Sequence, residues 1–448
     1  MALLNKEAFD DDFIWGVSTA AYQIEGAHNK DGKGPSIWDV FVQKKKRILQ
    51  GQHGNIACDF YHRYPEDLEL MQSLNIYNHR FSIAWSRIFP EGNGQINQQG
   101  VDFYNKLIDR SLELGIKSWI TLYHWDMPYA LDRKGGWTNR DVKEWFGEYV
   151  ATCVKHFGDR VKDWIVLNEP TVFCAAGYFF GIHAPGKKGL DTFLAAAHHT
   201  ALAQAHGARI IKSLQTDSNV GTTFSCSHVQ PFSSKEKDIR AAKKADLLLN
   251  RLFIEPLLGL GYPTDGIKVL NGIEKYMQQN DEQDLRFNMD FIGLQNYTRE
   301  IIKHSYFVPY LRAEIVSAKK RAVETTSMNW EVYPESVYHI LKKFSTYPNI
   351  PPLIITENGA AFPDDMVNGQ INDLKRKQYL QDAIQQVLRA KQEGVNVKGY
   401  FVWTFLDNFE WAEGYIPRFG LVYVDFPTQQ RIVKASGHWY AGFLKPAL

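Results

Sequence analysis

The sequence predicts an α/β protein that folds as one domain over residues 1–448, a closed (β/α)8 barrel. Eight short apolar runs alternate with helical segments along the chain, and the runs are apolar on both faces. This alternation is typical of a parallel sheet covered by helices, and eight such units favour closure into a barrel. A barrel of this kind carries its chemistry at the carboxyl ends of the strands. No proline- or glycine-rich linker divides the chain into separate domains.

The expected strands are apolar runs bounded by polar or turn-forming residues. They cover residues 13–17, 76–83, 117–123, 162–167, 219–224, 291–295, 353–356 and 397–405. Apolar residues at helical spacing predict helices within 68–74, 101–112, 142–153 and 195–210, and another helix is expected over 375–392. Segment 406–448 should supply a long loop and a last helix. Two open doubly wound domains are the alternative, but no strand is followed by the glycine-rich phosphate turn of such domains.

Composition excludes several classes of protein. The 51 basic residues nearly balance the 50 acidic ones, which leaves no electrostatic footprint for nucleic acid or an anionic membrane. The N-terminus lacks a secretory apolar core, and no later run approaches the ~18–20 apolar residues that span a bilayer, so we expect a cytoplasmic protein. The four cysteines are far apart without CxxC spacing and are expected to be buried free thiols. An aromatic content of 14% suits a carbohydrate-stacking cleft or, equally, a large aromatic core.

Two glutamates stand where strands end. The run WIVLNEP at 164–170 finishes in Glu169 and a proline that stops strand pairing, and the run IITENG at 354–359 finishes in Glu357. Either glutamate alone would be read as a helix cap or a surface ion pair. The two lie on the expected fourth and seventh strands, so only a closed barrel brings them together. Paired carboxylates can hydrolyse a glycoside, since one protonates the leaving oxygen while the other attacks the anomeric carbon.

Other strand ends carry amide, imidazole, carboxylate and indole groups. They are Gln23 near strand one, Arg80 at the end of strand two, the run Tyr123-His124-Trp125-Asp126 at strand three, and the segment WTFLDNFEWAEGY after strand eight. Such groups converging on one barrel mouth suit a neutral polyol with an apolar face.

The motifs FIWGVSTAAYQIEGA, TLYHWDMP, NEP, TENG, DNFEWAEGY and RFGLVYVDF together resemble family 1 glycoside hydrolases, the β-glucosidase group, over essentially the whole chain. The resemblance implies a retaining β-glucosidase acting on small β-glucosides and cello-oligosaccharides. It implies that Glu169 is the general acid/base, Glu357 the nucleophile, Arg80 the cation that keeps Glu357 ionised and Tyr297 its hydrogen-bond donor. The implied substrate-binding residues are Gln23, His124, Trp125, Asn168, Trp403, Glu410, Trp411 and Phe419.

This sequence departs from the family pattern in two places. Gln295 occupies the position where the family usually has asparagine, with Asn296 shifted by one place, so the role of that amide is open. Thr171 follows the NEP motif where many relatives carry an aromatic residue, so the preference for the leaving group is open too. The presence of Glu410, Trp411 and Phe419, rather than the pattern of relatives that use 6-phosphorylated sugars, predicts a free sugar as substrate.

Alternatives to this function remain. A broad β-galactosidase or β-fucosidase would use the same residues, because Gln23 and Glu410 can bind either C4 epimer. A non-catalytic sugar-binding barrel would lack one of the two carboxylates, and a metal-dependent hydrolase would need more ligands at strand ends than His124. No metal or organic cofactor is expected: His198, His199 and His206 are expected to pack or cap, and the basic run 44–47 to be solvated. The oligomeric state is open.

Overall fold

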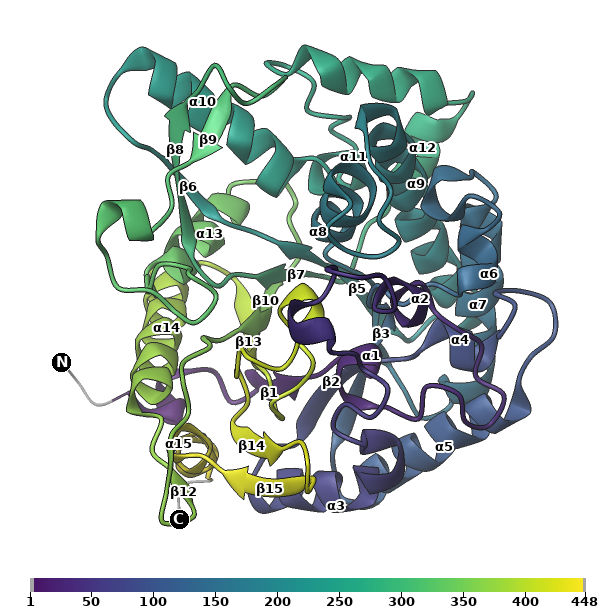
Figure 1. The fold of residues 1–448 in the computed structure, drawn as a ribbon. Coiled ribbons are helices and arrows are strands. Elements are labelled where there is room, and N and C mark those ends of the chain that lie inside the picture. Colours follow the sequence, from purple (N-terminus) through teal and green to yellow (C-terminus); the bar gives the residue numbers. More distant parts are fainter. Residues whose placement is uncertain (1–3, 446–448) are drawn as a thin grey trace.

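The fold is a closed barrel of eight parallel strands, seen in Figure 1 in a computed structural model that describes residues 4–445. Around the barrel the order is β1-β13-β10-β7-β5-β4-β3-β2. The barrel strands are β1 Ile14–Ser18, β2 Asn78–Ser82, β3 Lys117–Tyr123, β4 Asp163–Asn168, β5 Asn219–Ser225, β7 Phe291–Gln295, β10 Leu353–Asn358 and β13 Val397–Trp403. Each predicted strand overlaps one of these, so the predicted fold class is confirmed.

Helices surround the barrel, and six of the longer ones overlap the predicted positions. These six are α3 Phe60–Ser73, α5 Gln98–Glu113, α7 Val142–Phe157, α9 Leu190–Leu214, α14 Leu374–Gln392 and α15 Ala435–Leu444. Two more, α10 Glu236–Asp246 and α13 Ser336–Phe344, were not predicted. Shorter helices are α1 Ala21–Ile24, α2 Ile37–Phe41, α4 Trp85–Ile88, α6 Tyr129–Asp132, α8 Pro170–Cys174, α11 Ile254–Leu257 and α12 Asp281–Leu285. Leu112 lies in α5 as expected but is exposed, because the apolar face of this helix is formed by residues such as Val101, Tyr104 and Leu107.

Large side chains fill the interior of the barrel. This inner core consists of Trp119, Ile165, Phe291, Ile354 and Phe401, with Ile14 packed against it. Two glycines make room for it, because a Cβ on Gly16 would lie 2.5 Å from the Phe401 ring and one on Gly221 would lie 2.4 Å from the Phe291 ring. Most of these core residues lie in the first half of their strands, which leaves the carboxyl ends free to carry polar groups.

A second sheet extends the barrel wall beyond its mouth. It consists of β6 His228–Pro231, β8 Arg299–His304 and β9 Ala313–Ile315, in the order β6-β8-β9 (Figure 1). The strand β6 begins three residues after β5 ends, and β8 begins four residues after β7 ends. The chain therefore carries two barrel strands outward into this sheet, which the sequence analysis did not predict.

The segment after the last barrel strand contains more regular structure than the predicted long loop and helix. The helix α15 is present, but a hairpin of β14 Val422–Asp425 and β15 Gln430–Val433 precedes it. Another small hairpin, of β11 Met366–Val367 and β12 Gln370–Ile371, lies earlier in the chain, between β10 and α14. The buried carboxylate of Asp407 ties the segment after β13 together. It accepts hydrogen bonds from the Gly420 amide at 2.8 Å, Lys434 Nζ at 2.6 Å and Arg418 Nη1 at 2.8 Å. These bonds fix the loop between Trp403 and β14.

Candidate active site

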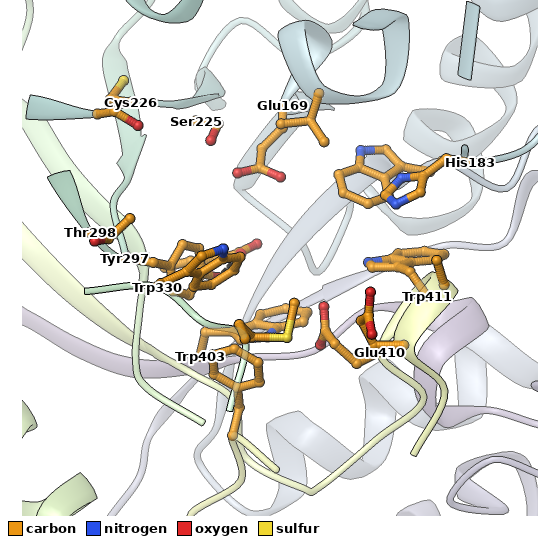
Figure 2. Close-up of a pocket in the computed structure, with 18 of the residues that line it drawn as sticks. Glu169, His183, Ser225, Cys226, Tyr297, Thr298, Trp330, Trp403, Glu410 and Trp411 are labelled. Atoms are coloured by element: carbon orange, nitrogen blue, oxygen red, sulfur yellow. Dashed lines mark hydrogen bonds between the residues drawn. The ribbon is translucent and has the colours of Figure 1, made fainter. Parts of the chain in front are cut away.

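A cavity of about 340 Å³ opens at the carboxyl ends of the barrel strands. Nine of the twelve predicted site residues line it: His124, Trp125, Glu169, Tyr297, Glu357, Trp403, Glu410, Trp411 and Phe419. Figure 2 shows Glu169 and Glu410 reaching into the cavity from opposite sides. The remaining three, Gln23, Arg80 and Asn168, are fully buried and hydrogen-bond to residues that line the cavity.

Glu357 is held by two hydrogen-bond donors. It lies near the end of β10, where Arg80 Nη1 donates to its Oε1 and the Tyr297 hydroxyl donates to its Oε2 at 2.6 Å. Arg80 lies in the middle of β2 and not at its end as predicted. Burial raises the pKa of Glu357, but the Arg80 guanidinium and the hydrogen bonds from Tyr297 oppose this rise by stabilising the charged carboxylate.

Glu169 occupies a different environment. It directly follows β4 as the N-cap of α8, and among residues 4–445 no cation forms an ion pair with it. Burial, followed by the negative charge of Glu357, raises the pKa of Glu169 well above its usual range. Because only Glu357 is paired with a cation, the pair shares its charge unequally: Glu357 ionises first and Glu169 keeps its proton.

The backbone at the cavity is unusual as well. Glu169 has a φ of 48°, Trp125 of 77° and Trp411 of 47°, all in the left-handed region that residues other than glycine seldom adopt. Each of these side chains lines the cavity. The left-handed backbone is therefore associated with the placement of one carboxyl and two indoles in the cleft.

Gln295 takes the amide position that the sequence left open. Its Nε2 donates to Asn168 Oδ1 at 2.8 Å, and Arg80 Nη2 donates to the same oxygen. Asn296 instead donates to the carbonyl of Cys226 at 2.8 Å and that of Thr298 at 3.0 Å, so it holds loop backbone together. The shifted asparagine is thus structural, and Gln295 belongs to the hydrogen-bond network around Glu357.

Aromatic rings and polar groups form the far end of the cavity. His124 stacks on Trp403 and Trp411 with ring centroids 5.9 Å away in both cases, and Trp125 packs on Trp411 at 4.6 Å. Burial lowers the pKa of His124 well below its usual range, so its neutral ring can accept the hydrogen bond from Asn168 Nδ2 at 3.0 Å. Neutral rings beside polar side chains suit the faces and hydroxyls of a sugar.

Glu410 lies in the loop after β13, as predicted. Gln23 Nε2 donates to the Phe409 carbonyl at 2.9 Å and to Glu410 Oε2 at 3.4 Å, whereas Gln23 Oε1 has no partner within residues 4–445. Burial, and then the charge of Glu357, raise the pKa of Glu410 to about 8. Near neutral pH, Glu410 therefore carries a proton for much of the time and can both donate and accept hydrogen bonds.

The cavity is acidic. Five glutamates line it, Glu169, Glu300, Glu357, Glu410 and Glu413, and the described residues contribute neither a lysine nor an arginine to its lining. A phosphate or carboxylate on the ligand would meet no cation there, which favours a neutral ligand.

A buried carboxyl pair at the mouth of an eight-stranded barrel, with one member held charged and the other protonated, has the parts that glycoside hydrolysis needs. The family model described as "Glycosyl hydrolase family 1" matches residues 5–446. The chain belongs to glycosyl hydrolase family 1.

This family 1 member is similar to known proteins over nearly the full length of both chains. The chain is 45% identical to "Beta-glucosidase A" of Thermotoga maritima over 99% of each protein, and 44% identical to "1,4-beta-D-glucan glucohydrolase" of Thermotoga neapolitana over 98% of each. A solved structure described as "Beta-glucosidase from Thermotoga maritima in complex with deoxynojirimycin" superposes with a TM-score of 0.93 at 43% identity, covering 97% of this chain and 98% of that one.

Residues that the sequence analysis set aside have structural contacts in this family 1 chain. His198 is hydrogen-bonded to Asp281 at 2.8 Å, and His199 to the Trp137 carbonyl at 3.1 Å. Within residues 4–445, no group of three histidines, cysteines or acidic residues could hold a metal ion.

All four cysteines are buried and free, and Lys44 to Lys46 of the basic run are exposed. None of the helices in the described part of the chain is long and apolar enough to cross a membrane.

Part of the cavity wall consists of residues that were not predicted from the sequence. The missed lining residues are Val172, His183, Ser225, Cys226, Ser227, Leu249, Thr298, Glu300, Met328, Trp330, Ala412 and Glu413. The three residues 225–227 lie at the end of β5 and just beyond it, so a search of every strand end would have found them. Thr171, which marks one departure from the family pattern, is absent from this lining, whereas its neighbour Val172 is part of it.

Proposed function

We propose that this family 1 member is a retaining β-glucosidase that hydrolyses terminal non-reducing β-D-glucosyl residues of small β-glucosides and cello-oligosaccharides. The observation that carries the proposal is the unequal carboxyl pair, in which Arg80 and Tyr297 hold Glu357, whereas no cation among the described residues pairs with Glu169. The names of the two Thermotoga relatives, a β-glucosidase and a 1,4-β-D-glucan glucohydrolase, support the choice of sugar and linkage.

In the proposed mechanism the two carboxyls act in sequence. The charged Glu357 attacks the anomeric carbon while Glu169 gives its proton to the glycosidic oxygen, so the bond to the leaving group breaks and a covalent glycosyl-enzyme forms. Glu169, now ionised, takes a proton from a water molecule that attacks the same carbon and releases Glu357. Two inversions at one carbon retain the β configuration.

The remaining predicted residues bind the sugar or support the pair. Arg80 and Tyr297 keep Glu357 ionised, and Gln295 joins them through Asn168. Gln23, His124, Asn168 and Glu410 bind the hydroxyls, while Trp125, Trp403, Trp411 and Phe419 supply the apolar surfaces. We take residues 1–448 as one catalytic domain that needs no cofactor. A cytoplasmic location is also part of the proposal, and the four free cysteines support it.

Proton NMR of early hydrolysis tests this function. With 4-nitrophenyl β-glucoside as substrate, β-glucose should appear first, and the α anomer only as mutarotation proceeds. If α-glucose is the first product, double displacement through Glu357 is wrong. Comparing kcat/KM for the glucoside, galactoside, fucoside and 6-phosphoglucoside tests the sugar preference, and a higher value for the galactoside or fucoside would favour the alternative function.

A change at Glu410 should alter catalysis without altering stability. Glu410→Ser should lower kcat/KM for the β-glucoside by roughly 10-fold or more, because the shorter side chain no longer reaches the sugar hydroxyls and a hydrogen bond to them is lost. The melting temperature should stay near that of the wild type, since Glu410 lies in a loop at the cavity and outside the apolar core. Steady-state kinetics and thermal unfolding measure the two effects. A large fall in melting temperature would instead make Glu410 a structural residue.

A further inference from the structure

Two carboxyl groups of the cavity lining, those of Glu300 and Glu413, have no part in the mechanism described above, and of these Glu413 is exposed whereas Glu300 is partly buried. Glu300 lies on β8, in the sheet that continues the barrel wall outward, and it lines the same cavity as Glu169 and Glu357. It follows Tyr297, the hydrogen-bond donor to Glu357, by three residues, which span at most about 10 Å of extended chain. Glu300 is therefore placed on the outer part of the cleft wall, near the reacting carboxyls but beyond the barrel mouth.

The side chain of Glu300 lacks the partners that a partly buried carboxyl normally has. Neither a hydrogen bond nor an ion pair joins its carboxyl to any residue between 4 and 445. The two nearby arginines are engaged by Glu331 instead. Arg299 donates to the Glu331 carboxylate at 2.9 and 2.7 Å, and Arg321 Nη1 lies 2.7 Å from it. Glu331 thus neutralises the cations that could have paired with Glu300.

The pKa of Glu300 is raised to about 7, because the effect of burial is larger than the opposing effect of the positive charge on Arg321. The carboxyl of Glu300 is only partly buried, and no residue between 4 and 445 donates a hydrogen bond to it. It is therefore available to a ligand that brings hydrogen-bond donors into the cavity. The unpaired carboxyl is thus better explained by ligand binding than by a role in the fold.

The surroundings of Glu300 indicate which ligand group it meets. Trp330, Met328 and Leu249 provide an indole and apolar surface in the same cavity, and Thr298 and Ser227 provide hydroxyls. Figure 2 shows Thr298 and Trp330 on the side of the cavity opposite Trp411 and His183. An indole, an apolar surface and a free acceptor together suit a polyhydroxylated ring. Because Trp403, Glu410 and Trp411 are assigned to the glucosyl ring that is cleaved, this second ring would be the one that leaves.

We propose that Glu300 is a specificity residue for the leaving group, whose carboxyl accepts hydrogen bonds from the hydroxyls of a departing sugar. It thereby raises kcat/KM for cellobiose and longer cello-oligosaccharides relative to aryl glucosides, whose leaving groups carry no such donors. This inference rests on the proposed β-glucosidase function and names the part of the substrate that Glu300 recognises. Glu300 does not take part in bond cleavage.

The test is the ratio of kcat/KM for cellobiose to kcat/KM for 4-nitrophenyl β-glucoside, which cancels effects shared by both substrates. In Glu300→Ala this ratio should fall by about 10- to 100-fold, because the departing sugar loses a hydrogen bond to a charged group and a bond of that kind contributes about this factor. Glu300→Gln keeps an acceptor oxygen, so its ratio should lie between the ratio of Glu300→Ala and that of the wild type. Glu314→Gln is the matched control, since Glu314 lies in the neighbouring strand β9 but is absent from the cavity lining, and it should keep the wild-type ratio.

Equal losses on both substrates would make Glu300 a structural residue and overturn the inference, as would an unchanged ratio in Glu300→Ala. If Glu300→Ala fails to fold, Glu300→Gln decides by the same ratio. Failure of the proposed function is a separate result, because the wild-type enzyme would then hydrolyse neither β-glucoside.

Discussion

Replacing Glu357 with alanine is expected to remove nearly all turnover, on the order of 10⁵–10⁶-fold, as is found when a catalytic nucleophile is deleted. Glu357 is the member of the pair that carries the charge, because Arg80 and Tyr297 both donate to it. Without its carboxylate, no glycosyl-enzyme can form. The loss should be similar for aryl glucosides and cellobiose, since both pass through the same intermediate.

Mass spectrometry provides an independent measurement of this role. A 2-deoxy-2-fluoro glucoside with a good leaving group should add its sugar mass to the peptide that contains Glu357 in the wild-type protein, and should leave Glu357→Ala unlabelled. The isosteric Glu357→Gln controls for misfolding, and its unfolding temperature should show that the barrel remains intact. Labelling of the peptide that contains Glu169 would reverse the assignment of the two glutamates.

Replacing Glu169 with alanine should give a loss that depends on the leaving group. General acid catalysis is typically worth about 10²–10⁴-fold, and the gain is largest when the departing oxygen is strongly basic. The leaving group of 2,4-dinitrophenyl β-glucoside needs almost no proton, so glycosyl-enzyme formation from this substrate should be nearly unaffected. Hydrolysis of cellobiose should fall by the full factor, because a sugar alkoxide cannot leave unprotonated.

Pre-steady-state kinetics should separate the two steps in Glu169→Ala. A burst of dinitrophenolate should precede a slow steady state, since the same variant lacks the base that activates water for the second step. Added azide, a nucleophile that needs no base, should speed that second step and yield β-glucosyl azide. Equal losses on both substrates, with no burst, would show that Glu169 is not the acid.

Much of the fold and of the site follows from local sequence patterns. The predicted runs overlap all eight barrel strands, because strands buried on both faces are mainly apolar, although β2 also buries Arg80 in its middle. Glu169 and Glu357 could be found because each interrupts such a run at its carboxyl end, where the barrel geometry places chemistry. The same logic locates His124 and Trp125, directly after β3.

Other parts of the site depend on tertiary contacts that no local pattern encodes. Glu300 lies within β8, in a sheet that forms only because two strands continue past the barrel. Its carboxyl has no partner within residues 4–445 because Glu331 engages both nearby arginines. The sequence alone could not show which of Gln295 and Asn296 belongs to the site. Both side chains are amides, and only the folded backbone decides which one points toward Asn168. The hairpin of β14 and β15 was missed because its short strands are half polar.

The left-handed backbone at Trp125, Glu169 and Trp411 limits how this enzyme could be made more heat-resistant. Each such residue costs on the order of 1–3 kcal/mol, and a folded domain retains only about 5–15 kcal/mol of net stability. Glycine at these positions would relieve the strain, but it would also delete a carboxyl or an indole from the cleft. Engineering for durability would therefore trade activity for stability here, and it is better directed at helices on the outside of the barrel, such as α5 and α14, whose exposed residues do not line the cavity.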